Sequence, residues 1–525
     1  MNKKIFVVLL SGMLLSGCTS IRDMLPKISR THKVKPVKPI KESMPVQKKD
    51  LLDEEVRYAE IDNQYNIFDK INLPKPRNYF TNKIPYLVAV NDNKDVEFNL
   101  FSSYDEGKAL AYYKNLNYRA VGDNSLYWRW KTSISKNKFY DNVESKLKNI
   151  IKNNKRNVLK LVNDSWVTTP SSDIGNVKSV KVSVRGVSGV VNHLLVETSN
   201  GKYLVLKEYN VRRILATGNN LYGSKGGSGS YNNKPISNSV SILPSAYLAI
   251  DDNGGEITIY GSGYGHGAGM PQYSAFDMAR QGYTYEAILK KYYRGAKLST
   301  VSEVLGSHDT VKVGITNNGN LEHKSMKFKS ETNIKLTDNK LVNLNISPGK
   351  ILEVRGSNGS LVVNVNGKEY KTNRQINLST DEGKITVYPL NKSHTNSPSY
   401  RGSITMYAVG SSFRIINNVN IEDYLLQVVP SEMPSSFGVE ALKTQAVAAR
   451  TYAISDFLKN RYTDMGFHVK DTVESQVYNN QIENSLATEA IKATAGEILT
   501  YNNKPIDAKY FSTTPGFTSN ASDIW

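Results

Sequence analysis

The sequence has 525 residues, of which 39% are hydrophobic and 10% aromatic, so it is long enough for several domains and ordinary in composition for a globular protein. Its single cysteine excludes an internal disulfide and a cage of several thiolates around a metal, so the core must supply the stability. The 67 basic and 48 acidic side chains give a formal net charge of +19, which predicts a surface that favours polyanions. Lysines are spread along the chain rather than clustered, so a generally basic composition explains the charge equally well.

The N-terminus has the pattern of a bacterial lipoprotein signal peptide. Two lysines precede an apolar run over 5–15 that is too short to span a bilayer. Residues 15–18 read LSGC, which matches the lipobox, in which the cysteine receives a diacylglycerol. We therefore expect residues 1–18 to form the signal peptide and Cys18 to carry the lipid, with an incidental cysteine as the alternative.

Export changes which polyanions are expected as partners. Anionic wall polymers, phospholipid head groups and acidic glycans come before nucleic acid for an exported chain. Residues 19 to about 56 carry Lys, Pro and Thr with little apolar periodicity, which predicts a charged tether that continues, with an approach segment, to residue 83. No later segment is long and apolar enough to cross a bilayer, so we expect the lipid to be the only anchor of a protein that faces the cell wall.

Residues 84–305 combine helical and strand patterns. Apolar positions over 138–155 have helical spacing, whereas residues 176–208 alternate and predict paired strands. A loop rich in Gly and Ser is expected at 224–230.

Residues 306–418 predict a small antiparallel β subdomain. Short alternating runs from residue 309 onward are separated by Asn-Gly turns at 318–319, 358–359 and 366–367. Asn-Gly between alternating apolar runs is a strong signal for a hairpin.

The last region, 419–525, is richer in helix. Ser435 or Ser436 can cap a helix from about 437 to 459, with Glu440 in the first turn, where the helix dipole favours an acid. Five alanines leave this helix little side chain, so it must pack closely against its neighbours. The elements together predict an α+β fold that is rich in strands and contains one packed, alanine-rich helix.

Two stretches of the sequence are more informative than the rest, and the first is Gly-rich. Residues 261–269 read GSGYGHGAG, and five glycines in nine positions let the backbone approach a ligand closely. The pattern is superficially similar to the dinucleotide fingerprint, but it lacks a βαβ context, and exported proteins rarely meet free NAD. We expect no nucleotide cofactor, and the seven scattered histidines predict no metal site.

The second informative stretch, 420–452, contains one glutamate between two prolines. Glu432 lies between Pro430 and Pro434, which predicts a fixed loop just ahead of a helix N-terminus. Partial burial there raises the pKa of an acid, as protonation of a glycosidic oxygen near neutral pH requires. The helix dipole favours the anion instead, so burial must dominate if Glu432 is the acid. A surface glutamate in a turn is the alternative, and composition alone favours it.

Both stretches resemble signature segments of the stage II sporulation protein D and amidase enhancer family, as do residues 472–478, 493–501 and 510–512. The resemblance covers most of 84–300 and 309–525. It implies a peptidoglycan lytic transglycosylase, which cuts between N-acetylmuramic acid and N-acetylglucosamine with one glutamate as acid and then as base. The muramic acid's own primary hydroxyl attacks and closes an anhydro ring, so the second carboxylate of a hydrolase is not needed. On the resemblance, Glu432 is the catalytic glutamate.

The family motifs also indicate residues that line the same groove: Lys443, Gln445, Arg450, Gln476, Tyr478, Ser512, His266, Gln272 and Tyr273. Lys443 and Arg450 are about two helical turns apart and share one helix face, from which both can address sugar or lactyl carboxylate oxygens. A buried arginine that ties down a loop is an equal alternative for Arg450. For the other residues, glycan binding and shaping of the loop both stay open. Some relatives bind a metal through cysteines, which this chain with its single cysteine cannot do, and the residues after Ser512 depart from the family pattern.

The two halves of the family domain occur here in reversed order. In the family the glutamate half comes first and the Gly-His-Gly half last, joined through a segment that resembles Trp525 followed by 84–90. We therefore expect a circularly permuted domain, with the former ends linked across about 296–309. Two alternatives remain: half-domains that complete one another between molecules, and a rearranged or inaccurate gene whose product folds poorly.

The resemblance thus predicts an exported, lipid-anchored transglycosylase that acts on the glycan strands of peptidoglycan. A non-catalytic protein that binds peptidoglycan and enhances a cell-wall amidase is the main alternative. A lipoprotein that ties the membrane to the wall is a third. We expect no cofactor and no nucleic-acid partner.

Overall fold

The computed structural model describes residues 49–50, 56–59, 65–68, 70–76, 83–101, 105–226, 229–338 and 343–525. The expected signal peptide with Cys18, and most of the expected tether 19–83, lie outside the described residues. Two compact units are present: unit 1 contains Arg57–Ala268 and Thr513–Trp525, and unit 2 contains Gly269–Ser512 with the few described residues before Arg57. Within the described ranges, no helix has the length and apolar character of a membrane span. The domain boundaries expected at residues 305 and 418 follow from the order of the two family halves, and they stay predictions.

Unit 1 is built on two antiparallel sheets, with strand orders β1-β5-β6-β7-β3-β4 and β8-β2-β10-β9 in the described part of the chain. Its elements are β1 (Tyr65–Asn66), η3 (Phe98–Phe101), α1 (Glu106–Lys114), β2 (Trp130–Ser135), α2 (Lys136–Asn154), η4 (Lys155–Asn157), β3 (Val158–Val162), β4 (Ser165–Thr168), β5 (Val177–Arg185), β6 (Val191–Thr198), β7 (Gly201–Leu206), α3 (Glu208–Leu215), β8 (Tyr222–Gly223), β9 (Leu248–Asp252), β10 (Glu256–Gly261) and η7 (Ala521–Asp523). The paired strands predicted over 176–208 are confirmed as β5, β6 and β7.

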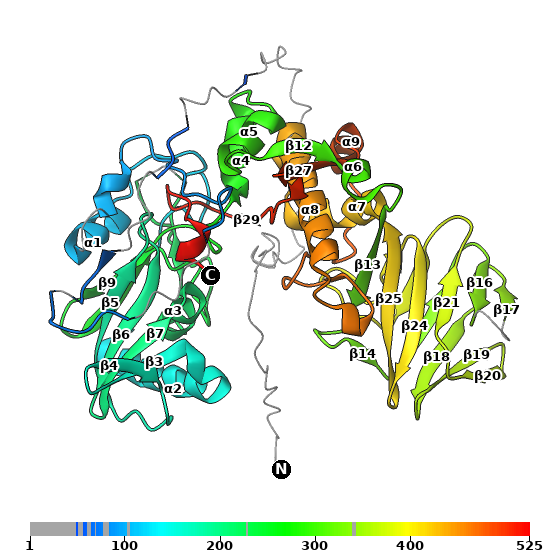
Figure 1. Cartoon of the computed structure of the whole chain (residues 1–525), viewed down its shortest axis with the longest axis horizontal. Helices are drawn as coiled ribbons and strands as arrows, with labels where there is room; N and C mark the ends of the chain where they lie inside the picture. The colour runs from blue at the N-terminus through cyan, green and yellow to red at the C-terminus, as the bar shows by residue number, and fades with distance from the viewer. Residues whose placement is uncertain are drawn as a thin grey trace. The chain divides into compact units, whose positions relative to one another are not determined.

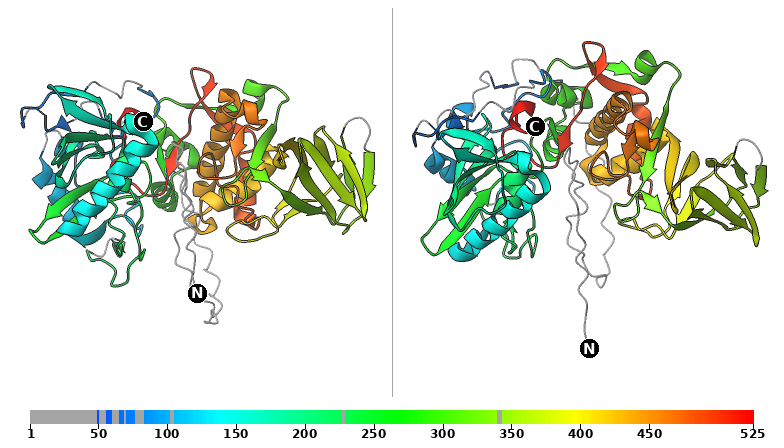
Figure 2. Two further views of the ribbon diagram at one scale, coloured as in Figure 1. Left: turned by 90° about the horizontal axis from the view of Figure 1, so that it is seen from below. Right: turned by 60° about the horizontal axis from the view of Figure 1, so that its bottom comes forward.

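Helix α2 covers the six-stranded sheet of unit 1. It buries Phe139, Val143, Leu147 and Ile150, which are three to four residues apart and so lie on one helix face. Figure 2 shows this helix lying across the strands, and α2 packs against β5 and β3. The helix predicted over 138–155 is therefore confirmed.

The C-terminal segment of the chain is an integral part of unit 1. The backbone N–H of Ala521 donates to the Leu87 carbonyl at 3.0 Å, and that of Thr518 donates to the Val90 carbonyl at 2.9 Å. The Asn520 side chain accepts from the Ala89 N–H at 2.8 Å. Residues more than 400 positions apart in sequence thus share one hydrogen-bonded ladder.

Unit 2 combines a two-sheet β structure with a group of helices (Figure 1). Its elements are β11 (Met270–Pro271), α4 (Gln272–Arg280), α5 (Tyr285–Tyr292), β12 (Lys297–Thr300), α6 (Val301–Leu305), β13 (Thr310–Ile315), β14 (Glu322–His323), β15 (Ser325–Lys329), β16 (Ile334–Thr337), β17 (Asn343–Ile346), β18 (Leu352–Ser357), β19 (Ser360–Val365), β20 (Lys368–Thr372), β21 (Ile376–Ser379), β22 (Ile385–Tyr388), β23 (Ser399–Tyr400), β24 (Ser403–Val409), β25 (Ser412–Asn420), α7 (Ile421–Glu432), η5 (Ser435–Phe437), α8 (Val439–Lys459), η6 (Thr463–Met465), β26 (Val469–Lys470), α9 (Ser485–Ala493), β27 (Glu497–Tyr501), β28 (Lys504–Pro505) and β29 (Tyr510–Phe511).

In the β structure of unit 2, the Asn-Gly turns at 358–359 and 366–367 join paired strands as predicted, whereas the strands on either side of 318–319, β13 and β14, both pair with β25 instead of with each other. One sheet has the order β17-β16-β21-β24-β25-β13-β26, with β14 beside β25, and the other has the order β20-β19-β18-β15-β22-β23, as far as the described residues show. Asn358 and Gly359, which join β18 to β19, have φ of 47° and 73°. Positive φ at both central residues is the requirement of a type I′ turn, which matches the twist of the strands.

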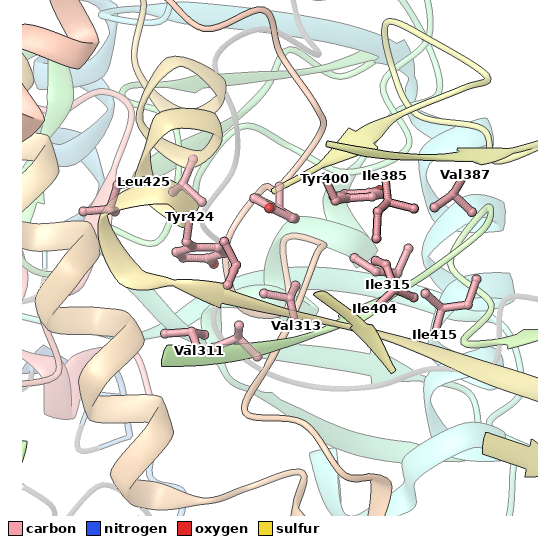
Figure 3. Packing of buried hydrophobic residues seen from close by; sticks show 14 of the residues in the cluster. Val311, Val313, Ile315, Ile385, Val387, Tyr400, Ile404, Ile415, Tyr424 and Leu425 are labelled. Carbon is pink, nitrogen blue, oxygen red and sulfur yellow. The ribbon is translucent and has the colours of Figure 1, made fainter. Parts of the chain in front are cut away.

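The two-sheet structure and the helices of unit 2 share one hydrophobic core. Figure 3 shows Tyr424 and Leu425 of α7 beside Val311 and Val313 of β13, with Tyr400 of β23 close by. All five side chains are fully or almost fully buried. The region 306–418 therefore packs directly onto the region 419–512 rather than forming a separate core.

Helix α8 is the alanine-rich helix that the sequence predicts. Its alanines at 441, 446, 448, 449 and 453 are buried, and α7, α9, α4 and α5 pack around it (Figure 1). The predicted serine cap is wrong: the N-cap is Gly438, with φ of 88° and no side-chain cap, because Ser435 and Ser436 lie in η5. The fold is α+β and rich in strands, as predicted.

Candidate active site around Glu432

Glu432 is the last residue of a helix rather than part of a loop. The expectation of a loop ahead of a helix N-terminus is wrong, because Pro430 lies inside α7 and α8 begins seven residues after Glu432, at Val439. A proline inside a helix removes one backbone hydrogen bond. Helix α7 is instead stabilised by its N-cap, where Asn420 accepts from the Glu422 N–H at 2.9 Å, and by burial of most of its side chains.

The carboxylate of Glu432 is buried and oriented by the backbone. The Glu432 side chain is about 1% exposed, and its Oε1 accepts a hydrogen bond from the Val477 N–H at 2.8 Å. Val477 follows β26 in the loop 471–479, so a segment from 45 residues further along the chain fixes the acid. A glutamate that merely lies in a surface turn is excluded by this burial.

Gln272, three residues after the Gly-rich stretch 261–269, is hydrogen-bonded to Glu432 and to Gln445 within unit 2. Its Nε2 donates to the backbone carbonyl of Glu432 and to Oε1 of Gln445, both at 3.1 Å. Gln272 and Gln445 are almost fully buried. Of the residues expected in the groove, Gln272 therefore contacts the expected catalytic residue directly, and Gln445 is joined to it through Gln272.

The short strands β11 and β29 explain why Gln272 arrives at this point. They pair in parallel, with Met270 opposite Tyr510, and the Tyr273 N–H then donates to the Ser512 carbonyl at 3.0 Å. The Tyr273 ring packs edge to face against Phe437, with centroids 5.1 Å apart. Ser512 and Tyr273 thus lie beside the Gln272 segment, where they shape the backbone.

Gln476 and Tyr478 are buried cross-links next to the glutamate. Gln476 accepts from the Tyr424 hydroxyl at 3.1 Å and donates to the Tyr510 hydroxyl at 3.3 Å. The Tyr478 hydroxyl donates to Asn417 at 2.9 Å, and burial raises the pKa of this phenol above its ordinary value. Both side chains therefore hold the loop 471–479 against α7 and β25.

Arg450 is saturated by groups of the protein itself. It forms a two-pronged ion pair with Glu422, at 2.8 and 2.6 Å, and donates to the Glu497 carbonyl at 2.9 Å. Its side chain is fully buried. Of the two roles considered for Arg450, this geometry favours the buried tie between α8, α7 and β27 over contact with a sugar.

Lys443 is also paired, but at the edge of the helix group. Its ammonium lies 2.9 Å from Glu440 and 5.5 Å from the centre of the Tyr285 ring. Glu440 in turn accepts from the Tyr285 N–H at 2.9 Å. The side chain of Lys443 is partly exposed, so it remains accessible while it joins α8 to α5.

His266 lies in unit 1, and its contacts are given within that unit. It is buried, its Nδ1 accepts from the Ala268 N–H at 3.1 Å, and its ring centre is 5.1 Å from that of Trp525. The Gly-rich stretch is therefore divided: residues up to Ala268 fold with unit 1 and residues from Gly269 with unit 2.

The sequence did not reveal several partners that complete this arrangement. Val477 acts through its backbone N–H, which leaves no trace in the residue type. Glu422, Glu497 and Tyr285 are polar residues on three different elements, and no spacing rule connects them before the fold is known. Among the described residues, no three His, Cys, Asp or Glu side chains are grouped as metal ligands.

Comparison with known proteins identifies relatives of this part of the chain. The family model described as stage II sporulation protein matches residues 409–501, which include Glu432 and the loop 471–479. No solved structure shows significant similarity to the chain.

Three curated relatives share sequence with the chain. Stage II sporulation protein D of Bacillus subtilis is 34% identical over 177 residues, which cover 30% of this chain and 50% of the relative. The protein of the same name from Bacillus amyloliquefaciens is 34% identical over 163 residues, 28% of this chain and 47% of the relative. The amidase enhancer of Bacillus subtilis is 42% identical over 98 residues, 19% of this chain and 13% of the relative. The chain thus spans about half, or less, of the length of these relatives, and the region that contains Glu432 is similar to the stage II sporulation protein D and amidase enhancer family.

Proposed function

We propose that this protein is a peptidoglycan lytic transglycosylase that cleaves the bond between N-acetylmuramic acid and N-acetylglucosamine, with Glu432 as its single acid and base. The observation that supports this most is the position of Glu432. Its carboxylate is buried, and the Val477 N–H fixes its orientation. An acid that donates a proton and later accepts one needs both properties.

The placement of the neighbouring acids fits a mechanism with one carboxyl group. Glu422 lies ten residues before Glu432 on α7, about 15 Å along the helix axis at 1.5 Å per residue. Paired carboxylates of glycoside hydrolases are about 5 to 9.5 Å apart. Glu422 is in addition paired with Arg450, and Glu440 is paired with Lys443. These three acids of α7 and α8 therefore do not form a hydrolase pair.

The proposed reaction balances without water. Glu432 gives its proton to the glycosidic oxygen as the bond between that oxygen and C1 of the muramic acid breaks. The resulting carboxylate then takes the proton of the muramic acid's C6 hydroxyl as this oxygen bonds to C1. The products are a glycan end with an anhydro ring and a free N-acetylglucosamine end, and Glu432 is again protonated.

A cleavage assay with denuded glycan strands tests this function. The wild-type protein is expected to release anhydro-ended products, and Glu432→Gln is expected to release none above background while it keeps the wild-type melting temperature. Glu489→Gln, an exposed glutamate on α9, is the matched control and should cleave as the wild type does. Equal product release by Glu432→Gln would refute the catalytic role.

Enhancement of a wall amidase is the second candidate function, since part of the chain is similar to the amidase enhancer of Bacillus subtilis. A cell-wall amidase is the partner that this relative suggests. Binding of glycan strands by the wild type and by Glu432→Gln, with no cleavage by either and with faster hydrolysis by an added amidase, would favour this function.

The proposal includes export, lipidation at Cys18 and a permuted domain that folds within one chain. Backbone hydrogen bonds between residues 87–92 and 516–521 support the last point, because they join the chain's end to the segment that follows it in the family order. Labelling with a radioactive fatty acid that is lost in Cys18→Ser tests the anchor. A monomer in light scattering, with activity per molecule that does not depend on concentration, would exclude completion between molecules.

A further inference from the structure

Unit 2 contains a cavity at the ends of two parallel strands. Strands β13 and β26 pair in parallel, with Val313 opposite Val469, so the loops that follow them leave the sheet at the same edge. The cavity has a volume of about 410 Å³ and is lined by residues that include Thr316, Asn318, Asn391, Lys392, Asp471 and Asn479. We call it the 471–479 pocket. Its volume lies within the range of small-molecule sites, about 300 to 1,000 Å³.

The charged groups that line the 471–479 pocket, Lys392 and Asp471, are paired with each other and hydrogen-bonded to Thr316. Lys392 forms an ion pair with Asp471, and the side chains of both are buried. Asp471 also accepts from the N–H and the hydroxyl of Thr316, at 2.9 and 2.8 Å, while Lys392 donates to the Thr316 carbonyl at 2.8 Å. The positive charge of Lys392 is therefore neutralised within the protein.

The remaining polar groups of the pocket are uncharged. Asn318 and Asn391 are exposed, and Asn479 is partly exposed. Each amide can donate and accept hydrogen bonds, as the hydroxyl and acetamido groups of sugars require. A phosphate or carboxylate would instead require an unneutralised cation, which this lining does not offer.

The pocket is connected to Glu432 through one residue. Val477 lines the pocket, and its N–H holds the Glu432 carboxylate at 2.8 Å. The Tyr478 N–H is bonded to the Asp471 carbonyl at 3.3 Å, so the pocket floor and the acid belong to the same loop. Two of the three pocket walls, by contrast, come from the β region 306–418, outside the helix group that carries Glu432.

We propose that the 471–479 pocket is a saccharide subsite, which holds sugar units of the glycan strand whose bond is cleaved at Glu432. This inference rests on the proposed function, because it assigns the substrate side of the same site. The β region then contributes to substrate binding as well as to the core. Binding of strands is expected to depend on Asn391 and Asn479, whose side chains are directed by no other hydrogen bond among those the structure describes.

The test measures binding in the full-length Glu432→Gln protein, so that no substrate is consumed. Titration calorimetry measures the dissociation constant of a denuded glycan hexasaccharide for three proteins. The first is Glu432→Gln, the second adds Asn391→Ala and Asn479→Ala to it, and the third, the control, adds Asn373→Ala, at an exposed asparagine outside the pocket. Loss of two uncharged hydrogen bonds is expected to raise the dissociation constant about 10-fold in the double variant and to leave it unchanged in the control. Asn391→Trp, which fills the pocket from an exposed position, should weaken binding similarly.

The outcomes separate this inference from the proposed function. An unchanged dissociation constant in both pocket variants overturns the subsite, even if the protein with Glu432 intact releases anhydro products. Competition by sodium polyphosphate that is lost in Asn391→Ala/Asn479→Ala overturns it too, because the pocket would then be an anion site. Weakened glycan binding in the pocket variants, together with no anhydro products from the protein with Glu432 intact, supports the subsite and refutes the transglycosylase.

Discussion

Replacement of Arg450 by methionine distinguishes a structural arginine from one that binds substrate. Arg450→Met removes four hydrogen bonds, two to Glu422 and one each to the carbonyls of Glu497 and Ile491, and leaves Glu422 without its cation. Removing one partner of a buried ion pair costs about 3 to 5 kcal/mol. The Glu422 side chain is 31% exposed, so water reaches the carboxylate and the lower value, about 3 kcal/mol, applies.

This loss should be visible in the melting temperature of unit 2. For a unit of this size, 1 kcal/mol corresponds to about 2 to 4 °C, so we expect a decrease of about 6 to 12 °C in scanning calorimetry. Arg355→Met is the matched control, because Arg355 pairs with Glu369 at the surface, where both side chains are about half exposed, and it should shift the transition by less than about 4 °C. A melting temperature of Arg450→Met within 2 °C of the wild type, with weakened glycan binding, would refute the structural role.

Three further predictions concern Gly267, His193 and Gln272. Gly267→Ala should lower the free energy of unfolding by at least about 3 kcal/mol, because its Cβ would lie 1.9 Å from the Tyr247 hydroxyl at φ of 94°. Gly254→Ala, at φ of 84° with nothing within 4 Å, should cost about 1 to 2 kcal/mol in the same urea titration. Burial lowers the pKa of His193 to about 3, so the unfolded chain binds a proton near pH 6.5 that the folded chain does not. Stability should fall by about 1.4 kcal/mol per pH unit from pH 6 to pH 4, and His193→Leu should lose this component of the slope. Gln272→Met removes two buried hydrogen bonds and should lower stability by about 2 kcal/mol and strand cleavage about 10-fold.

Each of these predictions has an outcome that contradicts it. Equal costs for Gly267→Ala and Gly254→Ala would mean that the Tyr247 hydroxyl moves freely. A pH slope that His193→Leu leaves intact would assign acid sensitivity to other groups. Cleavage at the wild-type rate in Gln272→Met would show that this amide does not position the backbone of Glu432.

The position of Glu432 shows where sequence reasoning was incomplete. Two flanking prolines predicted a loop, since proline disfavours a helix interior. The structure places Pro430 within α7, where burial of residues such as Tyr424 and Val428 outweighs the missing hydrogen bond. Helix α7 packs against α8, α9, β25 and β13, and the burial of Glu432 at its end makes this residue a candidate acid.

The sequence by itself determined the local structure of this protein. Alternation and Asn-Gly turns specify the hairpins at 358–359 and 366–367, because only residues that tolerate positive φ suit type I′ turns. Alanine content specifies a tightly packed α8, and helical spacing specifies α2. These features depend on residues close together in the chain.

Only the tertiary structure decided how distant groups meet. The role of Arg450 depends on Glu422 and on the Glu497 carbonyl, which are 28 and 47 residues away. The orientation of Glu432 depends on a backbone N–H, which every residue except proline possesses and which no sequence pattern marks. The hydrogen-bond partners of these side chains and the 471–479 pocket depend on strand pairing and core packing, which bring loops that are remote in sequence to one edge of a sheet. They therefore follow from the fold and not from any single segment.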